Sequence, residues 1–362
     1  MKIPSSEERI INILEKQNWN ITGIQRLPLY KGGGLLNGPV IKYSVCHDGK
    51  ITNIAVKNVS IEPRILFRDL YSINARADKQ QLHLFDRCCS FLSMDRMPER
   101  EMFLYENRNL AISKNIPQIY GMEYKDQTLL LLMEDLSYCS CMDQIETPAV
   151  WGLEDISLAV ETLALFHHIE LCPKKKIALG GVPEKSETIT LFLNEFKDNI
   201  NKYVVINRIP QVEAAAADYI QRFSKYETCL KEYRKILIHN DFNIRNICLD
   251  KKSKKIKVYD WEFIDYGSPI MDLVDLFLSL SSEYLEKVNL DVWLQLYIKK
   301  ASVYGETGLN ISDLKEQLYY NTVKFSATRM NMYFLFYIKR KNFYIERMYR
   351  NIYRLLLYCA GR

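Results

Sequence analysis

One segment of this sequence, residues 235–264, most restricts how the chain can fold. It reads KILIHNDFNIRNICLDKKSKKIKVYDWEFI, in which three short aliphatic runs are separated by polar loops and turns. Runs rich in Ile, Leu and Val that are bounded by Asn, Asp, Lys and Ser predict strands. The first run leads to Asp241, a loop returns Asn246 to the second run, and the third run leads to Asp260. Three polar side chains are therefore predicted to converge at strand ends.

These three residues supply the groups that phosphoryl transfer to an alcohol requires. The reaction needs a carboxylate that orients the hydroxyl and accepts its proton, and oxygen ligands for a magnesium ion that neutralises phosphate charge. Taken singly, an Asp or Asn beside a turn is usually a turn or capping residue. The prediction of a phosphotransferase site therefore depends on Asp241, Asn246 and Asp260 occurring together with strands between them.

The N-terminal part of the chain has the pattern of an antiparallel sheet. Strand-like runs alternate with turns over residues 21–60, which predicts a meander of three strands. The other expected elements are an amphipathic helix at 5–18, a polar helical segment at 62–115, and strands at 116–121 and 128–133. One helix of the polar segment is expected to pack on the meander, and this lobe is predicted to end near residue 136.

The rest of the chain is predicted to be mostly helical around the β-rich segment. Helical patterns cover 153–169, 189–207, 211–233 and much of 311–358. A chain of 362 residues is longer than most chains that fold around a single hydrophobic core. The predicted fold class is therefore α+β with two lobes: 1–136, built on an antiparallel sheet, and 137–362, mostly helical.

The β-rich segment carries a resemblance to a known superfamily. The order His239-x-Asp241, four further residues, Asn246, and two hydrophobic strands leading to Asp260 resembles the catalytic loop and metal-binding aspartate of kinases. The resemblance implies that Asp241 is the catalytic base and that Asn246 and Asp260 are magnesium ligands. The ring of His239 is expected to pack and hold the loop, and it is not predicted to bind metal.

The resemblance extends into the N-terminal lobe. The run Ile-Ala-Val that ends in Lys57 resembles the kinase strand whose lysine holds the α- and β-phosphates. Glu101 lies in a Glu-x-x-x-Tyr pattern that resembles the helix glutamate that pairs with this lysine in related small-molecule kinases. Glu99 and Glu106 are nearby, so the sequence leaves the choice of glutamate open.

Two further segments are predicted to contact the nucleotide. A glycine run between the first two strands lets backbone amides approach phosphates without obstruction. It follows no Walker pattern and precedes a strand rather than a helix, so P-loop and Rossmann interpretations both fail. A second segment, in LLLLMEDL, resembles the interlobe connector whose backbone meets the adenine edge. The residues concerned are Gly32, Gly33, Gly34, Met133, Glu134 and Asp135.

Two features separate this sequence from protein kinases. Protein kinases have a lysine two residues after the catalytic aspartate, where this chain has Asn243. Only 12 positions separate Asp260 from Asp272, which resembles the aspartate that braces the catalytic loop, so no long activation segment fits. The compact spacing is similar to the aminoglycoside phosphotransferase and choline kinase group.

That resemblance implies a two-lobed protein-kinase-like fold and a phosphotransferase that uses ATP or GTP with Mg²⁺. The acceptor would be a hydroxyl of a small molecule such as an aminoglycoside or other antibiotic, a sugar, a nucleoside or an amino alcohol. Because the chain is net basic, at +5, with an Arg- and Tyr-rich C-terminal region, it favours an acceptor less cationic than an aminoglycoside.

Composition argues against several other classes. The lysines lie in short runs such as 174–176 and 251–255, which indicate solvated faces rather than a nucleic-acid-binding surface. Apolar runs fall far short of the ~20 residues that span a bilayer, and no export signal is visible, so a cytoplasmic protein without a membrane partner is expected. Nine cysteines without a CxxC pair indicate neither a zinc site nor a disulfide framework.

The competing interpretation is a kinase-shaped binding or structural protein that has lost turnover. Such a protein has no need to keep the lysine, the base and the metal ligands as a set. The joint presence of Lys57, Asp241, Asn246 and Asp260 therefore favours an enzyme.

Overall fold

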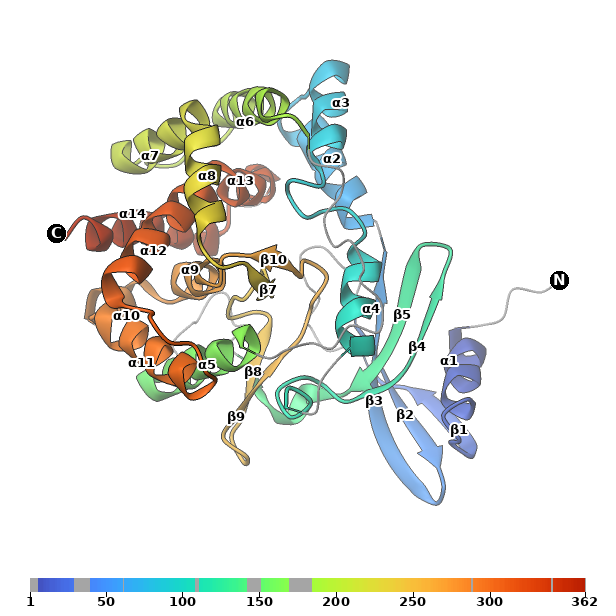
Figure 1. Ribbon diagram of the computed structural model, residues 1–362. Coiled ribbons are helices and arrows are strands. Elements are labelled where there is room, and N and C mark those ends of the chain that lie inside the picture. The colour runs from blue at the N-terminus through green and yellow to red at the C-terminus, as the bar shows by residue number, and fades with distance from the viewer. Residues whose placement is uncertain are drawn as a thin grey trace.

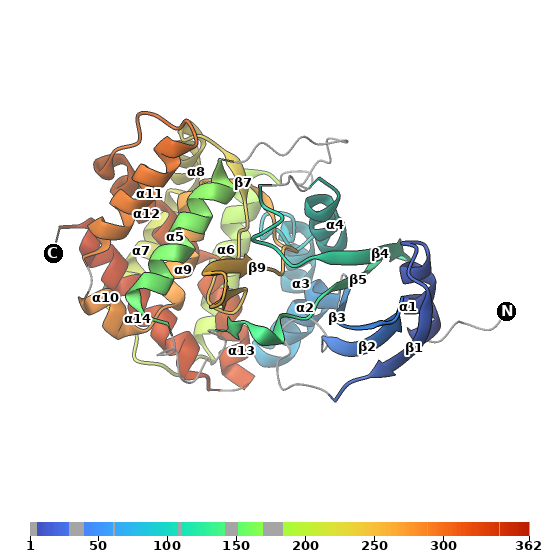
Figure 2. The same cartoon turned by 90° about the horizontal axis from the view of Figure 1, so that it is seen from below.

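The chain folds into a sheet-containing N-terminal lobe and a larger helical C-terminal lobe (Figures 1 and 2). The structure is a computed structural model, and it describes residues 6–28, 40–60, 62–107, 111–141, 151–168, 184–287, 289–339 and 341–361. The glycine run Gly32, Gly33 and Gly34 lies outside the described residues. The arrangement confirms the predicted α+β fold class.

The N-terminal sheet is antiparallel, with five strands in the order β1-β2-β3-β5-β4. Their bounds are β1 (Ile21–Arg26), β2 (Ile41–His47), β3 (Lys50–Val59), β4 (Ile119–Lys125) and β5 (Thr128–Glu134). Since side chains alternate across a strand, Ile54 and Val56 pack against helix α1 (Ser6–Glu15), while Ala55 belongs to the main core on the other face. Lys57 shares the face of Ala55 and is buried.

Three helices separate β3 from β4: α2 (Glu62–Asn74), α3 (Lys79–Cys88) and α4 (Met97–Asn107). As expected, one of them packs on the sheet, because α4 contacts β5. The other two reach the C-terminal lobe, where α2 contacts α13 (Arg329–Lys339) and α3 contacts α6 (Ser186–Asn201).

The C-terminal lobe wraps helices around one that is buried on every side, α9 (Ile270–Ser279). The other helices are α5 (Leu153–His167), α7 (Pro210–Gln221), α8 (Phe223–Glu232), α10 (Ser282–Lys287), α11 (Leu290–Val303), α12 (Ile311–Ala327) and α14 (Phe343–Cys359). Short strands lie beside α9 on the side of the N-terminal lobe: β6 (Ser140–Cys141), β7 (Ile236–Ile238), β8 (Ile247–Asp250), β9 (Lys255–Val258) and β10 (Asp265–Gly267).

Some helix limits differ from those predicted. The segment 211–233 forms two helices because Arg222, with φ −110° and ψ 28°, departs from helical geometry. The helix expected over 189–207 ends at Asn201, before Pro210 starts the next helix. In α4 Met102 is only half-buried, whereas the charged Arg100 and Glu101 are buried because they have polar partners.

No helix within the described ranges has the length and apolar character needed to cross a bilayer.

Candidate active site

The loop between β7 and β8 is held by a carboxylate at the start of α9. The side chain of Asp272 accepts hydrogen bonds from the backbone N–H groups of His239, at 2.8 Å, and Asn240, at 2.7 Å. Its Oδ2 also lies 3.0 Å from His167 Nε2, and Asp272 is fully buried. Asn240 has a φ of 59°, a left-handed conformation that asparagine adopts more readily than most residues and that the hydrogen bonds to Asp272 hold in place. The loop that carries Asp241 is therefore fixed in one conformation.

His239 contributes to this loop through packing. Its Nε2 lies 3.1 Å from the carbonyl oxygen of Tyr259, and its ring packs on Trp261 at 4.4 Å between centroids. Burial lowers the pKa of His239, so the neutral ring is favoured. These contacts match the structural role expected for His239.

The structure brings Asp241 and Asn246 into direct contact. The Asn246 amide nitrogen donates to Asp241 Oδ2 at 2.7 Å and to the Asp241 carbonyl oxygen at 2.9 Å. Burial raises the pKa of Asp241, while the positive charges of Arg329 and Arg245 oppose that rise. With its amide nitrogen occupied, Asn246 can offer its amide oxygen to a cation. The pair thus combines a restrained carboxylate with a hard oxygen donor.

Lys57 joins the two lobes at the other end of this site. Its Nζ donates to Glu101 Oε2 at 2.8 Å and forms a short ion pair with Asp260 Oδ1. Burial alone would lower the pKa of Lys57, but the carboxylates of Asp260, Glu101 and Glu262 outweigh that effect and raise its pKa well above the ordinary value. Lys57 is therefore held in its charged form.

The structure also distinguishes among the three candidate glutamates. Glu101 is completely buried beside Lys57, and burial raises its pKa although the charge of Lys57 opposes the rise. Glu99 instead accepts a hydrogen bond from the Tyr124 hydroxyl at 2.7 Å, and Glu106 is exposed. Of the three, Glu101 is the one that the structure brings to Lys57.

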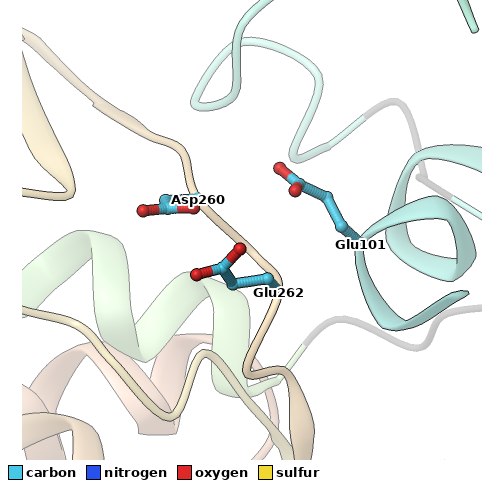
Figure 3. Close-up of side chains that lie close together, drawn as sticks. All are labelled: Glu101, Asp260 and Glu262. Carbon is cyan, nitrogen blue, oxygen red and sulfur yellow. The ribbon is translucent and has the colours of Figure 1, made fainter. Parts of the chain in front are cut away.

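A third carboxylate, Glu262, was not predicted to be part of the site. Glu101, Asp260 and Glu262 each place a carboxylate oxygen within 4.8 Å of the others (Figure 3). Asp260 has a φ of 68°, so the chain turns sharply between the end of β9 and Glu262. The signal in the sequence was the position of Glu262, two residues after the predicted ligand Asp260.

The oxygen donors here fit a magnesium ion. Mg²⁺ prefers hard oxygen ligands and binds through one or two carboxylates together with substrate phosphates. Asp260 and Glu262 supply carboxylates on one short segment, and Asn246 supplies an amide oxygen. Lys57 contacts Asp260 directly, so the lysine and a cation compete for this carboxylate.

A second group not predicted from the sequence is Arg329, the first residue of α13. Its guanidinium Nη1 lies 3.1 Å from Asp275 Oδ2 and 3.6 Å from Asp241 Oδ1, and Nη2 donates to the Asn240 carbonyl oxygen. Burial raises the pKa of Asp275 to about 8, and the charges of Asp241 and Asp272 add to the rise, while the positive charge of Arg329 opposes it. Arg329 thus supplies a positive charge beside Asp241, where the sequence offers Asn243 in place of a lysine.

The predicted connector residues lie at the end of β5. Met133 is buried, while the side chains of Glu134 and Asp135 are committed to ion pairs. Glu134 Oε2 lies 3.2 Å from Lys257 Nζ, and Asp135 Oδ1 lies 2.8 Å from Lys42 Nζ. Any contact of these acidic residues with a nucleotide would therefore come from their backbone, as predicted.

Comparisons with known proteins identify a family and similar folds. A model of the ecdysteroid kinase-like family matches residues 74–303, well over half of the chain. The fold is similar to that of a Plasmodium vivax ethanolamine kinase, with 15% identity, a TM-score of 0.53, and coverage of 93% of this chain and 82% of that chain. The GDP complex of aminoglycoside 2'-phosphotransferase-IIIa is also similar, with 15% identity and a TM-score of 0.48 over 99% of both chains.

A search of curated protein sequences found no match. The family match and the ethanolamine kinase confirm the predicted resemblance to small-molecule kinases and the two-lobed kinase-like fold.

Proposed function

Because this chain belongs to the ecdysteroid kinase-like family, we propose that it uses ATP or GTP with Mg²⁺ to phosphorylate a hydroxyl group of a small molecule. The observation that carries the proposal is the convergence of two pairs of side chains. Lys57 is paired with Asp260, and Asp241 is held by Asn246 at 2.7 Å. A binding protein without turnover has no need to restrain Asp241 with Asn246 while a charged lysine is held against Asp260.

In the proposed reaction, Asp241 orients the acceptor hydroxyl and takes its proton. The hydroxyl oxygen forms a bond to the γ-phosphorus as the bond to the β,γ-bridging oxygen breaks, so ADP or GDP leaves without a covalent enzyme intermediate. Asn246 holds the Asp241 carboxylate in place through its amide nitrogen. Such positioned proton acceptors contribute typically about 10²- to 10⁴-fold to a rate.

The nucleotide is assigned to the cleft between the lobes proposed at 1–136 and 137–362. Lys57 would contact the α- and β-phosphates, and Glu101 would hold the lysine in place. When bound, Mg²⁺ would neutralise charge on the phosphates, with Asn246, Asp260 and Glu262 as its protein ligands. The remaining predicted contacts are the backbone of Met133, Glu134 and Asp135 and the glycine run Gly32, Gly33 and Gly34.

Thermal unfolding with magnesium plus ATP or GTP tests this proposal. A ligand present at 100 times its Kd should stabilise the folded protein by about 2.7 kcal/mol. The increase in unfolding temperature caused by the nucleotide should require magnesium and should be largely lost in Asp260→Asn. If neither nucleotide shifts the wild-type transition, the chain is a kinase-shaped binding protein and the proposal is wrong.

A further inference from the structure

The catalytic loop is flanked by an arginine that lies between two tyrosine rings. The guanidinium carbon of Arg245 lies 5.7 Å from the Tyr333 ring centroid and 5.2 Å from the Tyr344 ring centroid. Arg245 also donates to the Tyr333 hydroxyl and to Asn243 Oδ1, both at 3.2 Å. The two tyrosines come from α13 and α14, and α14 lies on the side of β7 away from the N-terminal sheet (Figures 1 and 2). This cluster adjoins Asp241, because Arg245 contacts Asn243, whose amide nitrogen donates to the Asp241 carboxylate at 2.9 Å.

Next to this arginine are buried polar atoms that the described part of the chain does not satisfy. The Tyr344 hydroxyl and the Nε and Nη2 atoms of Arg347 are buried and have no hydrogen-bond partner among the described residues. The Arg347 guanidinium carbon lies 5.2 Å from the Tyr344 ring centroid. Buried polar groups without partners are rare in folded proteins, and each calls for an explanation such as a bound ion.

The charge balance points to the kind of ligand. No carboxylate among the described residues lies within ion-pair distance of Arg347, and burial lowers its pKa. The Arg347 guanidinium lies over the Tyr344 ring, so its charge is close to the Tyr344 hydroxyl. Two buried guanidinium nitrogens without a partner among the described residues are costly, and an oxyanion is the group that a guanidinium binds best.

We propose that Arg347 and Tyr344 bind an oxyanion group of the acceptor, so the substrate is an anionic alcohol, bearing a carboxylate, phosphate or sulfate group, rather than an amino alcohol. This inference rests on the proposed kinase function, because it identifies the cluster as the acceptor side of that site. The Arg347 guanidinium donates two parallel N–H bonds, the Tyr344 hydroxyl donates a third, and Arg245 adds positive charge. A cationic acceptor would instead meet two arginines.

Inorganic sulfate is the probe that tests this site. Thermal unfolding is measured in sodium sulfate and in sodium chloride of equal ionic strength for wild type, Arg347→Gln and Arg350→Gln. Arg350 is the matched control because its side chain is half exposed on the same helix, 3.8 Å from Glu346. The apparent sulfate Kd should rise about tenfold or more in Arg347→Gln and stay unchanged in Arg350→Gln. An equal sulfate response in all three proteins would overturn the proposal.

A second variant separates binding from a structural role of the arginine. In chloride, Arg347→Met should unfold at a temperature equal to or above that of wild type, because the variant removes two buried nitrogens that have no partner among the described residues. In sulfate, wild type should be the more stable of the two. Arg347→Met less stable than wild type by the same margin in both salts would make Arg347 a structural residue and overturn the proposal.

The two proposals fail in different ways. If nucleotide with magnesium raises the unfolding temperature but the response to sulfate does not depend on Arg347, the proposed anion site is wrong and the proposed kinase function stands. If the response to sulfate depends on Arg347 but no nucleotide raises the unfolding temperature, the proposed kinase function is wrong and an anion-binding site remains. Ethanolamine and kanamycin should give no shift in any of the proteins, and stabilisation of wild type by either cation would contradict the anionic assignment.

Discussion

At the level of single residues, Asp241 is set apart by how tightly its carboxylate is held. Its side chain accepts from Asn246 at 2.7 Å and from the Asn243 amide at 2.9 Å, and Arg329 lies 3.6 Å away. These contacts restrain the carboxylate while burial raises its pKa, a combination that suits a group that must accept a proton during the reaction.

Asp241→Asn is expected to lower kcat by about 10²- to 10⁴-fold. The amide keeps the shape of the side chain but cannot take the proton, so the magnesium-dependent nucleotide shift in unfolding temperature should remain. Steady-state kinetics measure the loss of turnover, and thermal unfolding with magnesium and nucleotide measures the retained shift. Wild-type turnover in the variant would remove Asp241 from the role of base.

Arg329 is expected to act through Asp241 as a positioning residue. Above about pH 8, where Asp275 is ionised, Arg329→Met leaves the carboxylates of Asp275 and Asp241 without their guanidinium, which should lower the free energy of unfolding by about 3 kcal/mol. The double variant Arg329→Met with Asp275→Asn removes one of those charges and should recover part of the loss. Urea unfolding measures the free energy of unfolding of the single variants and of the double variant. If the losses of the single variants simply add in the double variant, Arg329 and Asp275 do not interact through their charges.

The pH dependence of stability should contain a contribution from Asp275. Its pKa is raised on folding to about 8 from an ordinary value of 3.8, so the folded state binds one more proton than the unfolded state between those pH values. The contribution of Asp275 to the free energy of unfolding is therefore fully present below about pH 4. It decreases as the pH rises toward 8, by up to about 1.4 kcal/mol per pH unit. Arg329, Asp241 and Asp272 face this group.

Urea unfolding of wild type and Asp275→Asn at several pH values isolates that contribution. Because the amide does not titrate, the free energy of unfolding of the variant should depend less steeply on pH across this window. Parallel curves for the two proteins would show that Asp275 is ionised in the folded state.

At the level of elements, α9 fixes the catalytic loop by presenting Asp272 at its start. The carboxylate accepts from the backbone N–H groups of His239 and Asn240 and contacts His167. Asp272→Asn turns one of these acceptor oxygens into a donor that faces another donor, whichever way the amide is oriented.

We expect Asp272→Asn to lower the free energy of unfolding by about 1–3 kcal/mol, since a buried donor is left without an acceptor. Turnover should also fall, because the loop would lose the conformation that positions Asp241. The two effects are measured by urea unfolding and steady-state kinetics at a temperature where the variant is fully folded. Unchanged stability would mean that the loop does not depend on α9.

The elements of this fold could be predicted where the signal is local. The polar residues after each short strand marked Asp241, Asn246 and Asp260, while Lys57 was identified by the resemblance of its strand to the kinase strand. Arg329 could not be found in this way, because an arginine at the start of a helix carries no local sign of what α13 packs against. The helix break at Arg222 was missed because its neighbours continue a helical pattern through it.

Burial in α4 was misjudged for a related reason. A sequence pattern assigns charged residues to the solvent, yet Arg100 is buried, with its guanidinium on the Ile264 carbonyl oxygen at 2.7 Å and on Asp95 at 2.9 Å. Glu101 is buried because Lys57 faces it. Ile264 and Lys57 lie far from α4 in the sequence, so only the tertiary structure reveals them as partners.

At the level of the whole molecule, ion pairs join the two lobes. Lys57 on β3 contacts Asp260 beyond β9, and Glu134 at the end of β5 contacts Lys257 on β9. The lobes are therefore held together by charges of the site itself as well as by apolar packing.

Replacing Lys57 should change the response to magnesium alone. In Lys57→Met, Asp260 loses its cation, so Mg²⁺ without nucleotide should bind about tenfold tighter or more than to wild type. Lys42→Met is the control, because Lys42 pairs with Asp135 away from the three clustered carboxylates. The affinity for Mg²⁺ is measured from the unfolding temperature at increasing magnesium concentrations. Equal affinity in wild type and Lys57→Met would show that Lys57 does not compete with Mg²⁺ for Asp260.

The Lys57–Asp260 contact has a consequence for the order of addition in the catalytic cycle. While the lysine pairs with this carboxylate, free Mg²⁺ must compete with Lys57 for Asp260, although Glu101 and Glu262 lie close by. The incoming phosphates give Lys57 a new anionic partner, and only then does Asp260 become available to the cation. Metal and nucleotide are therefore expected to enter as one complex, with free Mg²⁺ acting as neither a leading substrate nor an activator.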